Sequence, residues 1–151
     1  MYSWLVFVHL VGLVVFSIAH GVSVFAAFRA RRERDPNVVA TLLDVSKNAV
    51  GGLYIGLLLL GIGGLGAAWQ GGLLTAPWIV ASYVTLGVVL VVMWSVATPY
   101  YVNVRKIAED PAARGDGRLT AMLDSRRPEA LLAVGGIGLL VLVWLMVLKP
   151  G

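Results

Sequence analysis

Residues 49–69 read AVGGLYIGLLLLGIGGLGAAW, a run without one charged or amide side chain. A helix needs about 20 mostly apolar residues to cross the hydrocarbon core of a bilayer. Three further runs of this kind occupy residues 4–28, 78–101 and 130–148, and none of them alternates at period 2 as the strands of a membrane barrel do. The sequence therefore predicts an all-α fold: one integral membrane domain over residues 1–151, built as a bundle of four transmembrane helices at these ranges.

The composition of the chain excludes most soluble classes of protein. Of its 151 residues, 59% are hydrophobic and 13% are charged, and the mean hydropathy is +0.87, whereas soluble domains carry about 25% charged residues. The chain has no cysteine, which excludes disulfides, iron–sulfur clusters and covalently attached c-type haem. We therefore expect the lipid bilayer to be a partner of this chain, and we expect no nucleic-acid partner.

Basic residues indicate the orientation in the membrane. Eleven of the 12 Lys and Arg side chains lie in two segments, residues 29–47 and 105–127, while the connection 70–77 has no charge. Cytoplasmic loops carry the excess of Lys and Arg, and Trp prefers the membrane–water boundary. We expect a multi-pass protein of the bacterial inner membrane with both chain ends outside the cytoplasm. The residues that carry these two signals are Trp4, Trp69, Trp78, Trp144, Arg29, Arg31, Arg32 and Arg34.

The segment before the second membrane helix has a helical pattern of its own. Asp35 followed by Pro36 is typical of a helix start, with Asp as the N-cap and Pro at the first helical position. Apolar residues spaced three and four apart then share one face. We expect either a short amphipathic helix at the cytoplasmic surface or an extension of the second membrane helix. Residues 119–123 are a candidate for a short turn of helix.

Glycines are concentrated in the second and fourth predicted helices. Gly52 and Gly56 are four residues apart, Gly64 lies further along the same helix, and the fourth helix contains Gly135 and Gly136. Because lipid provides little hydrophobic force between helices, small residues that let backbones approach are typical of helix contacts. We therefore predict that these five glycines are helix-packing residues. Room for a flat cofactor and a face for a homodimer are the alternatives.

The only two histidines, His9 and His20, both lie in the first helix. Their spacing of eleven residues corresponds to about 20° past three full turns and about 16 Å along the axis, so they share a face. Ionisable side chains at membrane depth usually face the bundle interior and have a partner. In one interpretation each histidine is neutral and bonds another helix. Ser82 or Tyr83 is then the expected partner of His9, and Ser95 that of His20.

Two other interpretations give the histidines a chemical role. Imidazole suits iron and copper, and Met93 is close to His20 in expected depth, so His9, His20 and Met93 are candidate ligands for haem b or copper. A proton relay or solute path is the third interpretation. All acidic residues lie between the predicted helices with no histidine beside them, so no nucleophile–base pair is complete. We predict no catalytic residues and no enzyme activity.

Four pieces of the chain carry a resemblance to known sequences. They are the first helix with His9, the segment RARRERDP at 29–36, LTAPW at 74–78 and WLMVLKP at 144–150. In this order they resemble a bacterial family of predicted integral membrane proteins, domain-of-unknown-function family 2269, which implies a four-helix bundle and no established activity. His9 followed by Gly12 also resembles the first helix of copper-resistance D-type membrane proteins. That resemblance implies copper handling, but no histidine outside the first helix matches that family's further metal-binding residues.

These observations together predict a small polytopic membrane protein that is a structural or assembly component of a membrane complex. Its protein partner is a second copy of the chain or a larger membrane complex, and this role requires no cofactor. A haem- or copper-binding membrane protein that uses His9 and His20 is the first alternative, and a small-solute permease is the second.

Overall fold

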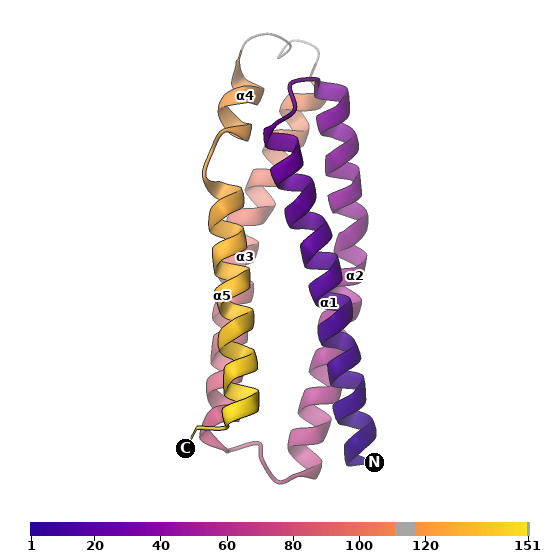
Figure 1. The fold of residues 1–151 in the computed structure, drawn as a ribbon, viewed down its shortest axis with the longest axis vertical. Helices are drawn as coiled ribbons and strands as arrows, with labels where there is room; N and C mark the ends of the chain where they lie inside the picture. The colour runs from indigo at the N-terminus through magenta and orange to yellow at the C-terminus, as the bar shows by residue number, and fades with distance from the viewer. Residues whose placement is uncertain (111–116, 151) are drawn as a thin grey trace.

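A computed structural model describes residues 1–110 and 117–150, and the regular structure in these ranges is entirely helical. The helices are α1 (Tyr2–Arg31), α2 (Pro36–Gln70), α3 (Pro77–Glu109), α4 (Arg118–Leu123) and α5 (Arg127–Leu148). α1, α2, α3 and the segment from α4 through α5 are long and apolar enough to cross a membrane. They form one elongated bundle (Figure 1), which confirms the predicted all-α fold with four spans.

The helices extend beyond the apolar ranges that the sequence predicts. α3 continues to Glu109 rather than ending at residue 101. α2 begins at Pro36, where Asp35 caps it by accepting a hydrogen bond of 2.8 Å from the backbone nitrogen of Asn37. Because α2 then continues unbroken past Gly52, residues 36–48 are an extension of the second membrane helix and not a separate amphipathic helix. The predicted turn of helix at 119–123 is present as α4.

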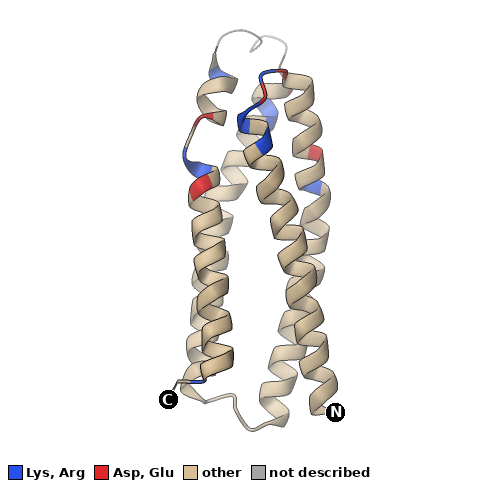
Figure 2. Cartoon of the chain, in the orientation of Figure 1, with Lys and Arg blue, Asp and Glu red and all other residues tan. Residues whose placement is uncertain are grey.

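Charged side chains gather at one end of the bundle (Figure 2). This end, which we call the charged end, carries the α1–α2 connection, the end of α3, α4 and the start of α5. Both termini and the turn between α2 and α3 lie at the opposite end (Figure 1). There the Lys149 ammonium lies 5.7 Å from the centre of the Trp78 ring. Trp4, Trp69 and Trp144 also belong to helix ends on this side and are at least half exposed.

α1 and α2 pack with their backbones in contact. A Cβ atom on Gly12 would lie 2.5 Å from the backbone nitrogen of Leu60, and one on Gly56 would lie 2.5 Å from the backbone nitrogen of Phe16. No side chain fits at such distances, so glycine sets how closely the two helices approach, as small residues do in membrane helix pairs. α3 and α5 form the other adjacent pair (Figure 1), and the contact of Gly138 with the Val89 side chain lies between them.

The main buried cluster lies toward the charged end. α1, α2, α3 and α4 each contribute to it, and its members are Ala30, Val39, Leu43, Tyr100, Val104, Ala108 and Leu123. Large apolar side chains along the middle of the spans face outward instead. Ile18, Leu58, Val91 and Ile137 are each more than half exposed. Apolar surface of this extent marks contact with a membrane rather than with water, which agrees with the four predicted spans.

Candidate functional site

Ion pairs connect the helices at the charged end. Among the described residues they are Arg31–Glu129, Arg34–Asp124, Arg105–Asp44 and Arg105–Glu109. Arg31 of α1 donates to Glu129 of α5 at 2.7 Å, and Arg105 joins α3 to Asp44 of α2. Because the carboxylate of each pair is about half exposed to solvent, these pairs contribute little to stability. The acids therefore serve as partners of arginine.

The connection between α1 and α2 contains one carboxylate with a defined structural role. Glu33 accepts hydrogen bonds from the backbone nitrogen of Arg34 at 2.9 Å and from that of Asp35 at 3.3 Å. Because these bonds favour the ionised form, they lower the pKa of Glu33. The ionised side chain thereby holds the short connection that sets the antiparallel pairing of α1 and α2.

A small polar cluster joins three helices beneath the charged end. The hydroxyl groups of Ser23 on α1 and Ser46 on α2 are 2.8 Å apart and buried. Tyr101 of α3 donates its hydroxyl to the backbone oxygen of Ser23 at 3.3 Å. Hydroxyl groups at membrane depth are costly without a partner, so these contacts hold α1, α2 and α3 in one arrangement. No sequence pattern predicts this cluster, because its members come from three different helices.

His9 bonds α2, not the third helix as the sequence analysis expects. Its Nδ1 lies 2.8 Å from the backbone oxygen of Leu60. Because a carbonyl only accepts, Nδ1 is the donor. The ring fits because Gly64 has no side chain: a Cβ there would lie 2.8 Å from Nδ1. Ser82, the expected partner, instead donates to the backbone oxygen of Trp78 on its own helix at 2.7 Å.

His20 occupies the contact between α1 and α5. Its ring stacks on Phe16 at a centroid distance of 6.1 Å. A Cβ on Gly135 would lie 2.6 Å from Nε2. Nε2 is buried and has no hydrogen-bond partner among the described residues. The expected partner, Ser95, donates to the backbone oxygen of Val92 at 2.9 Å.

The candidate ligands do not form a joint site in this arrangement. His9 faces α2, whereas His20 faces α5. Met93 is half-buried on α3, and in the described ranges no hydrogen bond connects it to either histidine. Over residues 1–110 and 117–150, no group of three or more His, Cys, Asp or Glu side chains is placed to hold a metal ion.

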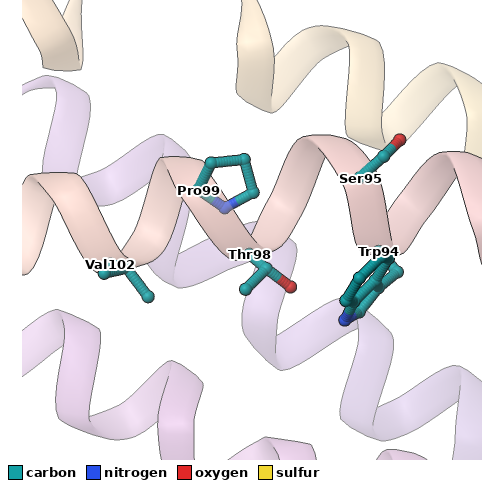
Figure 3. Close-up of a pocket in the computed structure, with 5 residues that line it drawn as sticks. All are labelled: Trp94, Ser95, Thr98, Pro99 and Val102. Carbon is teal, nitrogen blue, oxygen red and sulfur yellow. The ribbon is translucent and has the colours of Figure 1, made fainter.

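The middle of α3 carries an open surface and, toward the charged end, a proline inside the helix. From residue 83 to residue 99 no side chain of α3 is fully buried. Trp94, Ser95, Thr98, Pro99 and Val102 line a shallow hollow there (Figure 3). Pro99 has no N–H, so the Ser95 carbonyl loses its helical hydrogen bond. Trp94 is 72% exposed, and in the part of the chain that the structure describes neither its indole N–H nor the Thr98 hydroxyl has a hydrogen-bond partner.

The chain matches a family model over nearly its whole length. The model described as "Predicted integral membrane protein (DUF2269)" matches residues 3–150. The chain belongs to this family. Comparison of the DUF2269 chain with curated proteins and with solved structures gave no match.

Four of the five glycines singled out in the sequence lie at close contacts in the DUF2269 chain. Gly56 meets the backbone of Phe16, Gly64 meets His9, Gly135 meets His20, and a Cβ on Gly52 would lie 3.1 Å from that of Ala19. Gly136 has nothing within 4 Å of its Cβ position.

Two glycines outside the five predicted packing residues lie as close to a neighbouring backbone as Gly56 does in the DUF2269 chain. Gly12 meets the backbone of Leu60, and Gly63 meets the backbone of His9. For Gly63 the sequence contains one signal of such a contact, its spacing of seven residues from Gly56. Residues seven apart lie on nearly the same face of a helix, two turns along.

Proposed function

We propose that this DUF2269 protein is a structural or assembly component of a membrane complex, and that the exposed face of α3 is where a transmembrane helix of its partner binds. The observation that carries the proposal is the hollow at Pro99, on a stretch of α3 in which no side chain is fully buried. Helices in membranes associate through small residues and through Ser and Thr side chains. Gly87, with nothing within 4 Å of its Cβ position, lies on the same stretch.

The unpaired polar groups of this hollow favour a protein neighbour over lipid tails. The Trp94 indole, the Thr98 hydroxyl and the Ser95 carbonyl freed by Pro99 each need a hydrogen-bond partner in a medium without water. Acyl chains offer none, whereas a helix with its own hydroxyl or amide side chains offers both donors and acceptors. A partner helix would therefore remove a cost that the isolated bundle bears.

The proposal includes a location and an orientation. We place the protein in the bacterial inner membrane with the charged end in the cytoplasm, because Lys and Arg are concentrated there. Tyr100 and Tyr101 then lie near the inner boundary, and the hollow at Pro99 lies just within the inner half of the bilayer. The partner helix must therefore span the same membrane.

Site-specific photocrosslinking in native membranes tests this surface. A photoreactive amino acid at Val91, which is 66% exposed on α3, should give a discrete protein adduct. The matched site Leu58, 61% exposed on α2, should give only lipid adducts. Val91 adducts should weaken when Thr98→Leu is added. Co-expression of a larger tagged copy distinguishes a self-complex from a different partner by adduct mass. Lipid adducts alone at both sites would contradict the proposal.

A haem- or copper-binding function is the second candidate, and one observation favours it. The bond from Nδ1 to the Leu60 carbonyl leaves the lone pair of His9 on Nε2, and metal-bound histidines commonly donate their other N–H to a backbone carbonyl. Met93 would supply a thioether ligand only at the depth of His20, whose Nε2 would first have to leave Gly135. The absorption spectrum and metal content of the purified protein test this function. A Soret band or bound copper lost in His9→Ala would support it, and a colourless, metal-free protein would oppose it.

A further inference from the structure

His20 forms one of the contacts between the α1–α2 pair and the α3–α5 pair. His20 of α1 extends to α5, where only the absence of a side chain at Gly135 leaves room for its ring. Phe16 stacks on the ring with an interplanar angle of 4° and fixes its orientation. Nε2 therefore points into a contact from which bulk water is excluded, without an acceptor or donor among the described residues.

No described carboxylate or cation lies level with this ring on any of the four spans. On α2 the residue level with His20 is close to Gly52, because Gly52 contacts Ala19, the neighbour of His20 in sequence. The nearby Tyr54 is 68% exposed on the outer surface. On α5, Glu129 lies about 9 Å along the axis from Gly135 and is bonded to Arg31. Along each helix toward the charged end, the nearest other titratable groups are Arg127 on α5, Arg29 on α1, Lys47 on α2, and Tyr100 and Tyr101 on α3.

A protonated His20 would therefore carry a positive charge without a counter-charge while its ring lies against Gly135 of α5. A buried charge without a counter-charge or a hydrogen-bond partner is strongly unfavourable. At membrane depth such a charge is usually stabilised by water that penetrates to it. Water reaches Nε2 only if α1 and α5 separate. Separation is restrained at the charged end by the Arg31–Glu129 pair and by the bond from Tyr101 to Ser23, so the helices would open toward the chain termini.

We propose that His20 is a proton-sensitive joint: neutral, it lets α1 close on Gly135 of α5, and protonated, it drives the two helices apart. This inference concerns a conformational change inside the bundle. It does not depend on the partner proposed for α3, because α3 does not form the contact. Histidine is the side chain suited to this role, since its ordinary titration range lies near physiological pH.

Pulsed electron paramagnetic resonance measures the opening directly. The chain has no cysteine, so spin labels can be placed on Ile18→Cys and Ile137→Cys, which are 63% and 62% exposed and close to the joint in sequence. In lipid nanodiscs, the distance between the labels should lengthen or broaden by several ångströms as pH falls from about 8 to about 5. His20→Gln, which has a similar shape and does not titrate, should remove the pH dependence.

Two further variants keep the test decisive if His20→Gln does not fold. His9→Gln leaves His20 as the only histidine, and the pH-dependent change should persist in it. Gly135→Ala should lengthen the distance at both pH values, because its Cβ would lie 2.6 Å from Nε2. A distance that does not change with pH in the labelled parent would overturn the proposal. A change that survives in His20→Gln, or that is lost in His9→Gln, would do so equally.

Discussion

The imidazole of His9 donates a hydrogen bond of 2.8 Å from Nδ1 to the backbone oxygen of Leu60. This bond links α1 to α2 at a level where Gly63 and Gly64 bring the two backbones together. A histidine that is expensive to place in lipid is thus accommodated by a main-chain acceptor and by the missing side chain of Gly64. His9 and Gly64 therefore act as a unit, which makes their coupling measurable.

Replacing His9 by Leu should lower the free energy of unfolding by about 0.6–1.7 kcal/mol, the average and the largest values measured for hydrogen bonds between membrane helices. Gly64→Ala should also destabilise the protein, because its Cβ displaces the ring from Leu60. In the double variant the second change should cost less than it does alone. Unfolding titrations with SDS in mild detergent measure all four proteins. Strictly additive effects would show that the ring and Gly64 are not coupled.

Gly56→Ala should destabilise the α1–α2 pair by about 1–3 kcal/mol, the usual cost of overpacking. Its new Cβ would lie 2.5 Å from a backbone nitrogen of α1, which has no flexible end to move aside. Gly61→Ala is the matched control on the same helix, since nothing lies within 4 Å of its Cβ position. That control should be neutral or slightly stabilising, because Ala favours helix over Gly. Equal losses in both variants would refute the proposed role of Gly56.

The parts of this structure that follow from local sequence could be predicted, and those that depend on register could not. The length of each apolar run is sufficient to identify four spans, and Asp35–Pro36 is sufficient to mark the start of α2. The acceptor for His9 is a backbone carbonyl, which has no signature in the side chains. The meeting of His20 with Gly135 depends on how two distant helices pack. Gly136 is next to Gly135 in sequence yet faces open space, because adjacent residues of a helix point about 100° apart.

Removing the ion pair between α2 and α3 should have a small, salt-dependent effect. Asp44→Asn should lower the free energy of unfolding only slightly, because both side chains are partly exposed to solvent at the charged end. Exchanging the charges, with Asp44→Arg and Arg105→Asp together, should recover most of the loss seen in Asp44→Arg alone. Unfolding measured at low and at high salt tests this, since screening weakens exposed pairs. A loss of several kcal/mol would mean that the pair is far more protected than its exposure indicates.

Glu33 should make the stability of the α1–α2 connection sensitive to acid. Its pKa is lowered in the folded protein by hydrogen bonds from Arg34 and Asp35, so its contribution is complete above the unfolded pKa and is lost as pH falls through the lower folded value. The difference in unfolding free energy between the parent and Glu33→Gln should therefore shrink as pH drops below about 4.5. A difference that stays constant across this range would contradict the proposed role of the carboxylate.

Labelling of single cysteines from one side of the membrane tests the transmembrane topology, on which the proposals for the α3 surface and for the two histidines both depend. The chain contains no native cysteine, so Thr75→Cys, between α2 and α3, and Asn37→Cys, at the charged end, each give one exposed site. In spheroplasts, an impermeant maleimide should label Thr75→Cys at once and Asn37→Cys only after the membrane is permeabilised. Labelling of Asn37→Cys in sealed spheroplasts, or protection of Thr75→Cys, would contradict the orientation, and equal labelling of both would contradict the membrane-spanning bundle itself.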